Sequence, residues 1–358
     1  MISRVFSPRS FRSLSTSLEA SAAQHQRVII EDTLLPSQSS MGERHATENS
    51  QSSIWRRHNS VFHSISLESA QDIPSGKSNK SVLPEEIANL PMMAVMGRSN
   101  SGKSTLLNSI FGKGHKNRAK ASSRSGKTTD VDIFTVNGSF ALADLPGHSP
   151  PDGQLSLAWM KRWGPLVKKF LEHVAPSVRD DNEDLNALVP TLEPSSKMVR
   201  PLHGIFFLCD VRWPCSQEDQ ELLQSIGPEG LNIPTLLVFT KDDRIASDLH
   251  RKSKGHRRRR SSSDPEVQAA AINDVHFERI RLAKQRRAEL CWSGPHVHFS
   301  SGEWKGPQGG WGEGVVTANN PRRSRNHLRR YIETLCNTAS VSERHQLLVD
   351  AWTHSAGR

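Results

Sequence analysis

Cysteine is scarce in this chain of 358 residues, and its four cysteines follow no recognisable spacing. Cys209, Cys215, Cys291 and Cys336 have neither the spacing of metal ligands nor the framework of a small disulfide-rich domain. This pattern fits a reducing compartment, where disulfides are rare. Long apolar runs are also lacking, and no stretch is apolar enough to span a membrane. The composition thus excludes a disulfide-stapled scaffold and predicts no transmembrane helix.

Hydrophobic residues make up only 35% of the chain, which is low for a fully packed protein. Part of the chain is therefore expected outside a core, although the length suffices for one large domain with appendages or for two domains. The formal net charge of +10 predicts an anionic partner, most simply RNA or an anionic membrane face. Alternatively, the excess positive charge belongs to a cleaved presequence and one basic loop.

Acidic residues are missing before Glu19, where arginines and many serines occur instead. A segment rich in arginine and serine and poor in acids is typical of an organellar transit peptide rather than a secretory signal. The arginines favour the mitochondrion, and hence its matrix, over a plastid. A disordered basic tail has a similar composition and remains the alternative.

Composition divides the remaining chain into one ordered domain and several polar segments. Polar, serine-rich sequence precedes Leu83, where order is expected to begin, apart from a short amphipathic piece near Ile54 to Ile65. Inside the domain, an acidic, proline-punctuated stretch and the basic run Arg257 to Arg260 indicate insertions. The predicted segments are a transit peptide over 1–30, a disordered linker over 31–82, a domain over 83–338 with insertions at about 175–200 and 247–265, and a tail over 339–358.

Strand and helix patterns alternate along the domain. Two alternating apolar segments on either side of Asn137-Gly138 predict a β-hairpin. Short apolar runs ending at Cys209 and Phe239 have the form of buried parallel strands. Helical patterns occupy Leu157 to Val174 and several later segments. We therefore predict an α/β fold, a three-layer sandwich around a mostly parallel sheet with one antiparallel strand from the hairpin.

A glycine-bounded loop carries the clearest chemistry in the chain. It follows an apolar strand ending at Met96, fits GxxxxGK[ST], and leads into a helix starting near Thr105. Backbone N–H groups of such a loop approach phosphate oxygens, and the helix N-terminus adds partial positive charge. Lys103 would reach the β- and γ-phosphates, and the Ser104 hydroxyl would ligate Mg²⁺. The expected phosphate-binding residues are Gly97, Arg98, Ser99, Asn100, Ser101, Gly102, Lys103, Ser104 and Thr105.

Thr240-Lys241-Asp242-Asp243 follows a later strand and fits [NT]KxD. The Asp243 carboxylate would accept from both guanine N1–H and the exocyclic amine, which adenine cannot match, while the Lys241 stem lies over the base. Ser300 and Ser301, after the last short strand, would present N–H groups to guanine O6. The pattern predicts GTP or GDP as the bound nucleotide. Otherwise, these residues are a solvated charge cluster at a strand end.

The run Asp144 to Gly147 lies at the end of a predicted strand and fits DxxG. Asp144 would hold Mg²⁺ through water, and the Gly147 N–H would sense the γ-phosphate. Thr128 would be the switch threonine that ligates Mg²⁺ when γ-phosphate is present; Thr129 or an ordinary loop threonine is the alternative. His148 would orient the attacking water as a catalytic residue, beside Lys103 and Thr128, or would be a passive part of the switch.

With these motifs in this order, the chain resembles the EngB family of bacterial and organellar GTPases, within the TrmE–Era–EngA–EngB–septin-like class. The resemblance covers about Leu83 to Cys336 and includes Gly126-Lys127-Thr128 and Asp210-Val211-Arg212. It implies a P-loop GTPase fold and slow GTP hydrolysis with Mg²⁺. By the same resemblance, Asn100 would help bind K⁺. His148 stands where the family usually has an aromatic residue and resembles the DxPGH of translational GTPases.

The resemblance also implies that the protein assists assembly of the large ribosomal subunit, and in bacteria the family is linked to cell division or septation. Ribosomal RNA or large-subunit assembly intermediates would be the partners of a monomeric protein. The basic segments 251–260 and 279–287 would neutralise phosphates, and Trp304 or Trp311 would stack on bases, unless they are solvated or packing residues. A guanine-nucleotide-dependent scaffold without significant hydrolysis, on RNA or a membrane surface, is the alternative.

Overall fold

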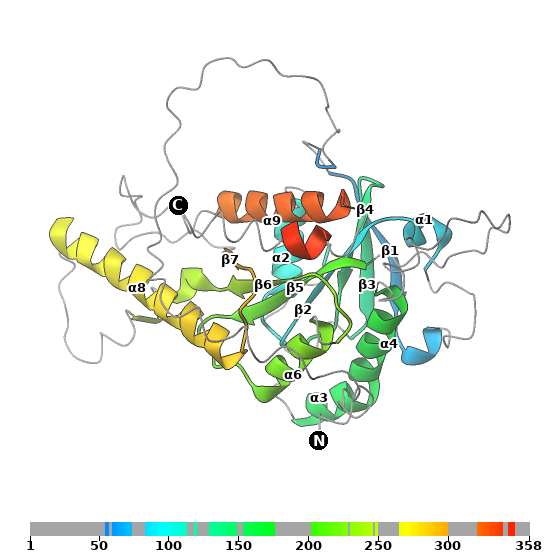
Figure 1. The fold of residues 1–358 in the computed structure, drawn as a ribbon, viewed down its shortest axis with the longest axis horizontal. Coiled ribbons are helices and arrows are strands. Elements are labelled where there is room, and N and C mark those ends of the chain that lie inside the picture. Colours follow the sequence, from blue (N-terminus) through cyan, green and yellow to red (C-terminus); the bar gives the residue numbers. More distant parts are fainter. Residues whose placement is uncertain are drawn as a thin grey trace, which may run out of the picture.

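A seven-stranded sheet forms the centre of the computed structural model, with helices on both of its faces (Figure 1). None of the helices in the described part of the chain combines the length and apolar character needed to cross a bilayer. The structure describes residues 54–56, 59–73, 83–112, 118–119, 129–148, 153–175, 202–227, 230–245, 248–249, 265–299, 321–338 and 343–347.

The strands follow the order β1-β3-β4-β2-β5-β6-β7 across the sheet. Only β3 runs against its neighbours, because it pairs antiparallel with both β1 and β4, whereas the other pairs are parallel. The predicted α/β fold with one antiparallel hairpin strand is therefore confirmed. The strands are β1 (Val61–Leu67), β2 (Met92–Gly97), β3 (Val131–Val136), β4 (Phe140–Asp144), β5 (Leu202–Asp210), β6 (Thr235–Thr240) and β7 (His296–Phe299).

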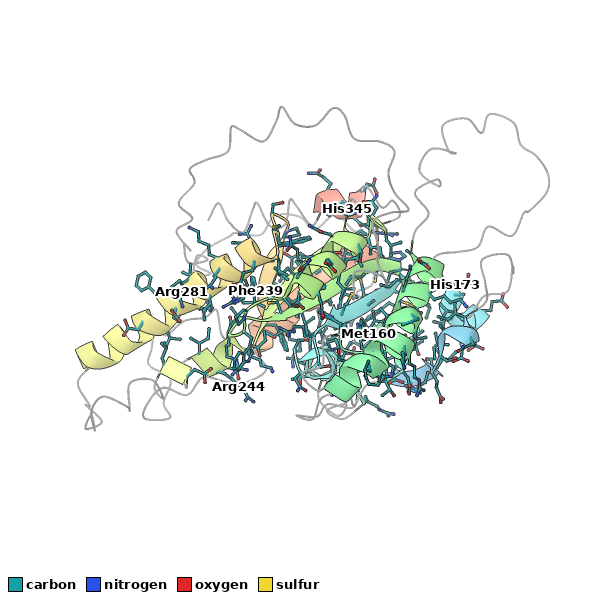
Figure 2. The ribbon with its side chains drawn as sticks, turned by 90° about the horizontal axis from the view of Figure 1, so that it is seen from below. Met160, His173, Phe239, Arg244, Arg281 and His345 are labelled. Carbon is teal, nitrogen blue, oxygen red and sulfur yellow. The ribbon has the colours of Figure 1, made fainter. Side chains whose placement is uncertain are left out.

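Central strands are buried on both faces, which explains their continuous apolar sequences. Every residue of β2 and β6 is buried. In β5, Phe207 packs in one core while Phe206 packs in the other. Such strands need cover on both sides, since each face would otherwise expose apolar surface. Phe239 of β6 belongs to the same core as Phe207 and lies within the packed interior (Figure 2).

Helices α2 and α9 cover one face of the sheet, where Leu106 and Leu328 join the core. Helices α4 and α6 cover the other face, where Leu166 and Leu222 are buried (Figure 1). The helices are α1 (Glu85–Ala88), α2 (Lys103–Phe111), α3 (Gly153–Ala158), α4 (Gly164–Val174), α6 (Gln217–Ile226), α8 (Pro265–Glu289) and α9 (Pro321–Cys336), with short 3-10 turns η3 (Ala70–Asp72) and η5 (Asp242–Arg244).

The helix predicted over Leu157 to Val174 is interrupted. A π-helical turn, Trp159–Trp163, lies between α3 and α4, and the Gly164 N–H donates to the Trp159 carbonyl. Pro165 follows directly and has no N–H to donate to the preceding turn, which favours such a widened turn. The periodicity of the apolar residues hid this break because it continues through both parts.

The prediction of a disordered linker over 31–82 is wrong for Val61–Leu67, which form β1 at the edge of the sheet. Val61 and Leu67 are buried, but most residues between them are exposed, and the pairing register shifts between His63 and Ile65. An edge strand buries little and its partner β3 lies about 70 residues later, so local sequence gives a weak signal. The predicted transit peptide and nearly all of both predicted insertions lie outside the described residues.

Candidate nucleotide site

The predicted motifs meet at one edge of the sheet. The phosphate loop follows β2, the DxxG motif begins at the last residue of β4, and the guanine motif begins at the last residue of β6. These strands run parallel, so their carboxyl ends lie on the same side, where α/β sheets bind ligands. The Thr240 hydroxyl donates to the Ser101 carbonyl at 2.7 Å, which joins the guanine motif directly to the phosphate loop.

The phosphate loop has a backbone that requires glycine at its start. Gly97 has φ of 149°, and a Cβ there would lie 2.5 Å from the Leu208 carbonyl oxygen. Gly102, at the N-cap of α2, has φ of 101° and leaves the first N–H groups of that helix without a side-chain cap. These N–H groups and the helix dipole form the anion-binding arrangement that the motif predicts.

Lys103 is folded back into the loop, where its Nζ donates to the carbonyls of Gly97 and Arg98, each at 3.0 Å. Burial lowers the pKa of Lys103 to about 8, although the nearby Asp144 opposes that shift. A phosphate would supply the compensating negative charge and favour the ammonium form. This placement is consistent with the predicted role of Lys103.

Ser104 and Asp144 form the arrangement expected of an Mg²⁺ site. The Ser104 hydroxyl donates to Asp144 Oδ2 at 2.9 Å, while the buried Asp144 Oδ1 has no hydrogen-bond partner among the described residues. Burial raises the pKa of Asp144 to about 6. Hard oxygen ligands suit Mg²⁺, which also takes ligands from phosphates and water. The residues therefore fit the ion, and a bound cation would favour the ionised carboxylate.

One residue of the guanine motif, Asp242, is buried and anchors the motif to the neighbouring strand β7. Asp242 is 1% exposed, and His298 of β7 donates from Nδ1 to its Oδ2 at 2.6 Å. The neighbouring Asp243 is half-buried, as a residue that reads a base must be. Sequence reasoning missed His298, because nothing in the order of residues links a histidine in a strand to an acid 56 positions earlier.

Lys241 connects the guanine motif to the phosphate loop and to the end of β5. Its backbone is left-handed, with φ of 63°, and its Nζ donates to the Asn100 carbonyl and pairs with Asp210 at 3.2 Å. Arg212 binds the same Asp210 carboxylate at 2.9 Å. Burial acts to raise the pKa of Asp210, but the hydrogen bonds from Arg212 and the charge of Lys241 outweigh it and lower the pKa. The ionised Asp210 thus orients the Lys241 stem.

The DxxG segment lies directly against the phosphate loop. Ser99 donates from its backbone N–H to the His148 carbonyl at 2.9 Å and from its hydroxyl to the Gly147 carbonyl at 3.3 Å. A Cβ at Gly147 would lie 2.7 Å from the Ser99 Cα and 2.8 Å from Lys103 Nζ. Only glycine permits this approach, which brings the predicted γ-phosphate sensor to the phosphate loop.

His148 faces the core rather than solvent. Its ring is 1% exposed, lies against Phe207 and Trp159 with centroids 5.9 and 6.1 Å away, and donates from Nε2 to Asp219 at 2.6 Å. Burial lowers the pKa of His148, and the Asp219 carboxylate only partly opposes this. The ring would have to leave Asp219 to orient a water molecule in the nucleotide site, so the catalytic role of His148 stays a prediction.

Asp219 holds His148 while capping α6. Its Oδ1 accepts from the histidine, and its Oδ2 accepts from the Ser216 N–H at 2.7 Å in a capping box. Burial acts to raise the pKa of Asp219, but the hydrogen bond from His148 and the other donors lower it overall. The pair is therefore an aspartate and a neutral imidazole. Sequence reasoning missed the contact between Asp219 and His148, because 71 positions separate the two residues.

Three predicted site residues lie outside the described part of the chain, namely Thr128, Ser300 and Ser301. The alternative switch threonine, Thr129, donates to Asp130 at 2.9 Å. Among the described residues, no three His, Cys, Asp or Glu side chains cluster as a metal site.

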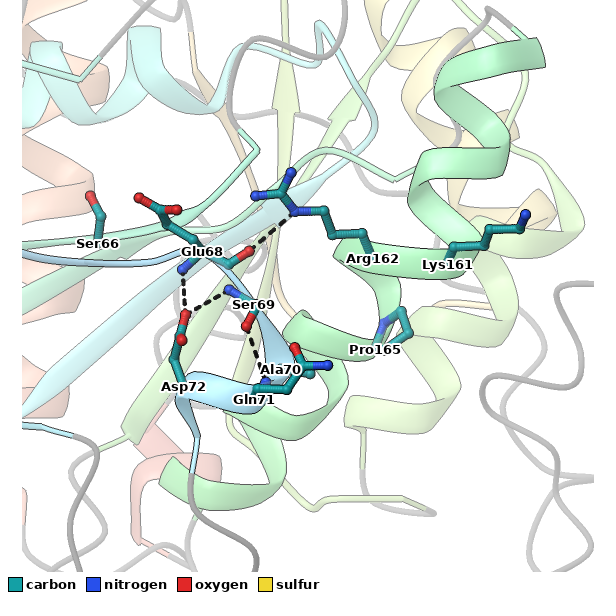
Figure 3. Close-up of a pocket in the computed structure, with 9 residues that line it drawn as sticks. All are labelled: Ser66, Glu68, Ser69, Ala70, Gln71, Asp72, Lys161, Arg162 and Pro165. Atoms are coloured by element: carbon teal, nitrogen blue, oxygen red, sulfur yellow. Dashed lines mark hydrogen bonds between the residues drawn. The ribbon is translucent and has the colours of Figure 1, made fainter.

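A polar cleft of about 690 Å³ lies away from these motifs, between the segment after β1 and the π-helical turn (Figure 3). Arg162 Nε donates to the Glu68 carbonyl across it at 3.3 Å, and Asp72 accepts from the Glu68 and Ser69 N–H groups. The cleft contains none of the predicted nucleotide-binding residues. It is lined by Ser66, Glu68, Ser69, Ala70, Gln71, Asp72, Lys161, Arg162 and Pro165.

Comparison with known proteins agrees with this geometry. Residues 92–241 match the family model described as "50S ribosome-binding GTPase". A "Probable GTP-binding protein EngB" of Geobacter metallireducens is 28% identical over 247 residues, covering 69% of this chain and 100% of that protein. Proteins of the same name from Alkaliphilus metalliredigens and Thermoanaerobacter pseudethanolicus are each 32% identical, over 47% and 46% of this chain and 65% and 70% of theirs.

The matched region contains the phosphate loop, the DxxG motif and the first residues of the guanine motif, which the structure brings to one edge of the sheet. The EngB resemblance and the P-loop GTPase sandwich are both confirmed. Sequence similarity and geometry lead to the same conclusion: the chain belongs to the EngB family of GTP-binding proteins, and it is a GTPase.

Proposed function

We propose that this protein is a GTP-dependent switch that assists assembly of the large ribosomal subunit in an organelle. The contact between the DxxG segment and the phosphate loop supports the switch most directly. Ser99 gives both its donors to carbonyls of Gly147 and His148, beside Lys103. A γ-phosphate would compete for these donors and for Lys103. Binding of GTP rather than GDP would therefore favour a different position of the segment.

Each group at the site has one role in the proposed cycle of GTP binding and hydrolysis. The N–H groups of the phosphate loop and Lys103 hold the phosphates, and Asp243 selects guanine. Ser104 and Asp144 would hold Mg²⁺, which would neutralise negative charge on the nucleotide phosphates. We propose a supporting K⁺ near Asn100, whose carbonyl accepts from Lys241. Release of His148 from Asp219 would let its ring orient the attacking water.

We propose ribosomal RNA as the partner, because the matching family is that of "50S ribosome-binding GTPase" proteins and the net charge is +10. Helix α8 contributes only part of its positive charge to such a surface. Arg286 is buried and donates to the Val211 carbonyl at 3.1 Å, whereas Arg281 and Lys284 are exposed. Arg281 lies past the middle of α8, toward its C-terminal end (Figure 2). We expect a monomeric protein in the mitochondrial matrix, with a plastid as the alternative.

The test is sedimentation of the full chain with large-subunit particles, with a non-hydrolysable GTP analogue or with GDP, across a salt series. We expect binding that needs the GTP analogue and weakens as salt rises. Asp243→Asn, which should lose guanine nucleotides, is the control and should not sediment. Equal sedimentation with both nucleotides, or binding to anionic vesicles instead of particles, would contradict the proposal. Negligible GTP turnover with particles present would favour the scaffold alternative.

A further inference from the structure

Two of the four cysteines lie in contact, although neither belongs to a nucleotide motif. Cys209 lies near the end of β5, and Cys215 lies just before α6. Their Sγ atoms are 3.4 Å apart, and both are free thiols. We propose that Cys209 and Cys215 form a redox-active dithiol, which closes into a reversible disulfide when it meets a small disulfide such as oxidised glutathione.

The local structure allows the bond to form with a small movement. A disulfide bond is about 2.05 Å long, so the sulfurs must approach by roughly 1.4 Å. Residues 211–213 form a turn, closed by a hydrogen bond from the Trp213 N–H to the Asp210 carbonyl at 3.2 Å, and residue 214 has no regular structure. Cys215 lies outside any helix or strand. It can therefore move toward Cys209 without breaking a strand pair.

The two thiols differ in exposure and in local environment, and this difference decides which thiol reacts first. Cys215 is half-buried and Cys209 is buried, so an oxidant meets Cys215 first. The hydrogen bond with Cys215, followed by burial, raises the pKa of the Cys209 thiol. Cys209 therefore stays protonated, and the more accessible Cys215 is the thiol that attacks first.

The reaction consists of two exchange steps. The Cys215 thiolate attacks one sulfur of oxidised glutathione, which forms a mixed disulfide and releases one glutathione thiolate. Cys209 then loses its proton and attacks the Cys215 sulfur, which releases the second glutathione. The protein loses two protons and two electrons, and one oxidised glutathione becomes two reduced molecules. Excess reduced glutathione reverses both steps.

The cysteine pair lies next to the guanine motif, the phosphate loop and, through Asp219 and His148, the DxxG segment. The Cys209 carbonyl accepts from the Thr240 hydroxyl at 3.3 Å, and the Pro214 carbonyl accepts from Arg98 of the phosphate loop at 3.2 Å. Cys215 directly precedes Ser216, whose capping box includes Asp219. Closing the disulfide would pull on the Arg98 contact and on Asp210, which holds Lys241. We therefore expect oxidation to speed the release of GDP.

The site is tested by incubating the reduced full chain with oxidised glutathione and measuring its mass. We expect the loss of two hydrogen atoms and no bound glutathione at completion. Trypsin cleaves after Arg212, between the two cysteines, so the disulfide should join two tryptic peptides. Cys215→Ser should prevent that product. Cys291→Ser is the matched control and should leave it intact, because Cys291 is exposed and distant in sequence.

Absence of the joined peptides in the wild type, or their persistence in Cys215→Ser, would overturn the proposal. The second readout is release of a fluorescent GDP analogue, for which we expect at least a threefold faster rate after oxidation. Reductant should restore the slow rate, and Cys215→Ser should not respond. A disulfide that leaves GDP release unchanged would overturn the coupling to the nucleotide site. GTP binding by the reduced protein tests the proposed function separately.

Discussion

Neighbouring residues in this site have opposite tasks, as the two acids of the guanine motif show. Asp242 is buried and bound by His298, while Asp243 is half-buried and is the predicted reader of the base. A chain segment that presents one carboxylate at a fixed position needs a second residue that fixes its backbone to the rest of the fold. The same division holds at Gly147 and His148, where the glycine meets the phosphate loop and the histidine is held in the core.

Replacing Asp243 by Asn should weaken GTP binding by about 100-fold, or roughly 3 kcal/mol, because two hydrogen bonds to guanine are lost inside a partly buried site. Titration with fluorescent nucleotides measures this change. ATP affinity should stay low in both proteins. Xanthosine triphosphate should bind the variant better than GTP does, since xanthine presents a carbonyl to the new amide. A variant with unchanged GTP affinity would show that Asp243 does not read the base.

His148→Ala should reduce GTP turnover at least about tenfold while leaving GTP affinity nearly unchanged, as expected when a proton-handling group is lost. Single-turnover hydrolysis with and without large-subunit particles provides the measurement. His345→Ala is the matched control, because the His345 Nε2 contacts the Asn232 carbonyl at 3.2 Å, outside the nucleotide motifs. Unchanged turnover under both conditions would leave His148 as a structural residue only.

At the scale of elements, the sheet depends on a strand from the segment before the main domain. β1 covers the outer edge of β3 over six paired positions, and it buries Val61 and Leu67. Asn59 adds a hydrogen bond from its Nδ2 to the Phe111 carbonyl at the end of α2. An uncovered edge strand invites pairing with other molecules. The segment thus belongs to the folded unit rather than to a linker.

Deletion of residues 1–73 should lower the melting temperature by several degrees and promote aggregation, because β3 then becomes an exposed edge. Deletion of residues 1–53 removes sequence before the described part of the domain and serves as the control, with little effect expected. Thermal unfolding followed by light scattering distinguishes the two truncations. Equal stability of both would mean that β1 contributes little to the sheet.

Across the whole molecule, the buried His148 and the half-buried His296 should make the fold sensitive to acid. Burial lowers the pKa of His296 to about 3 and also lowers the pKa of His148. Between the folded and unfolded pKa values, the unfolded chain binds more protons, so folding stability falls as pH falls. The contribution is fully present above about pH 6.5 and is progressively lost toward pH 3.

His296→Gln should flatten this dependence, because the variant has no group to protonate on unfolding. The wild type should lose up to about 4 kcal/mol more than the variant between pH 7 and pH 3. Urea unfolding at a series of pH values measures the difference. Parallel curves for the two proteins would contradict the expected role of His296.

Most of the fold was predictable because its signals are local. Buried parallel strands produce continuous apolar runs, and the Asn137-Gly138 turn, with φ of 55° and 64°, produces a hairpin. Site residues next to strand ends were also predictable, since parallel strands bring their carboxyl ends together. The β1 strand and the π-helical turn were not, because one depends on a distant partner and the other does not alter the apolar period.

The sequence by itself determined that this protein binds a guanine nucleotide, because phosphate and base recognition depend on short motifs whose residues are adjacent along the chain. Only the tertiary structure decided which distant groups support those motifs. It placed Asp219 on His148, His298 on Asp242, and Cys209 against Cys215. Such contacts arise from packing between separate elements, whose relative positions are set by the whole sheet and leave no pattern in the order of residues.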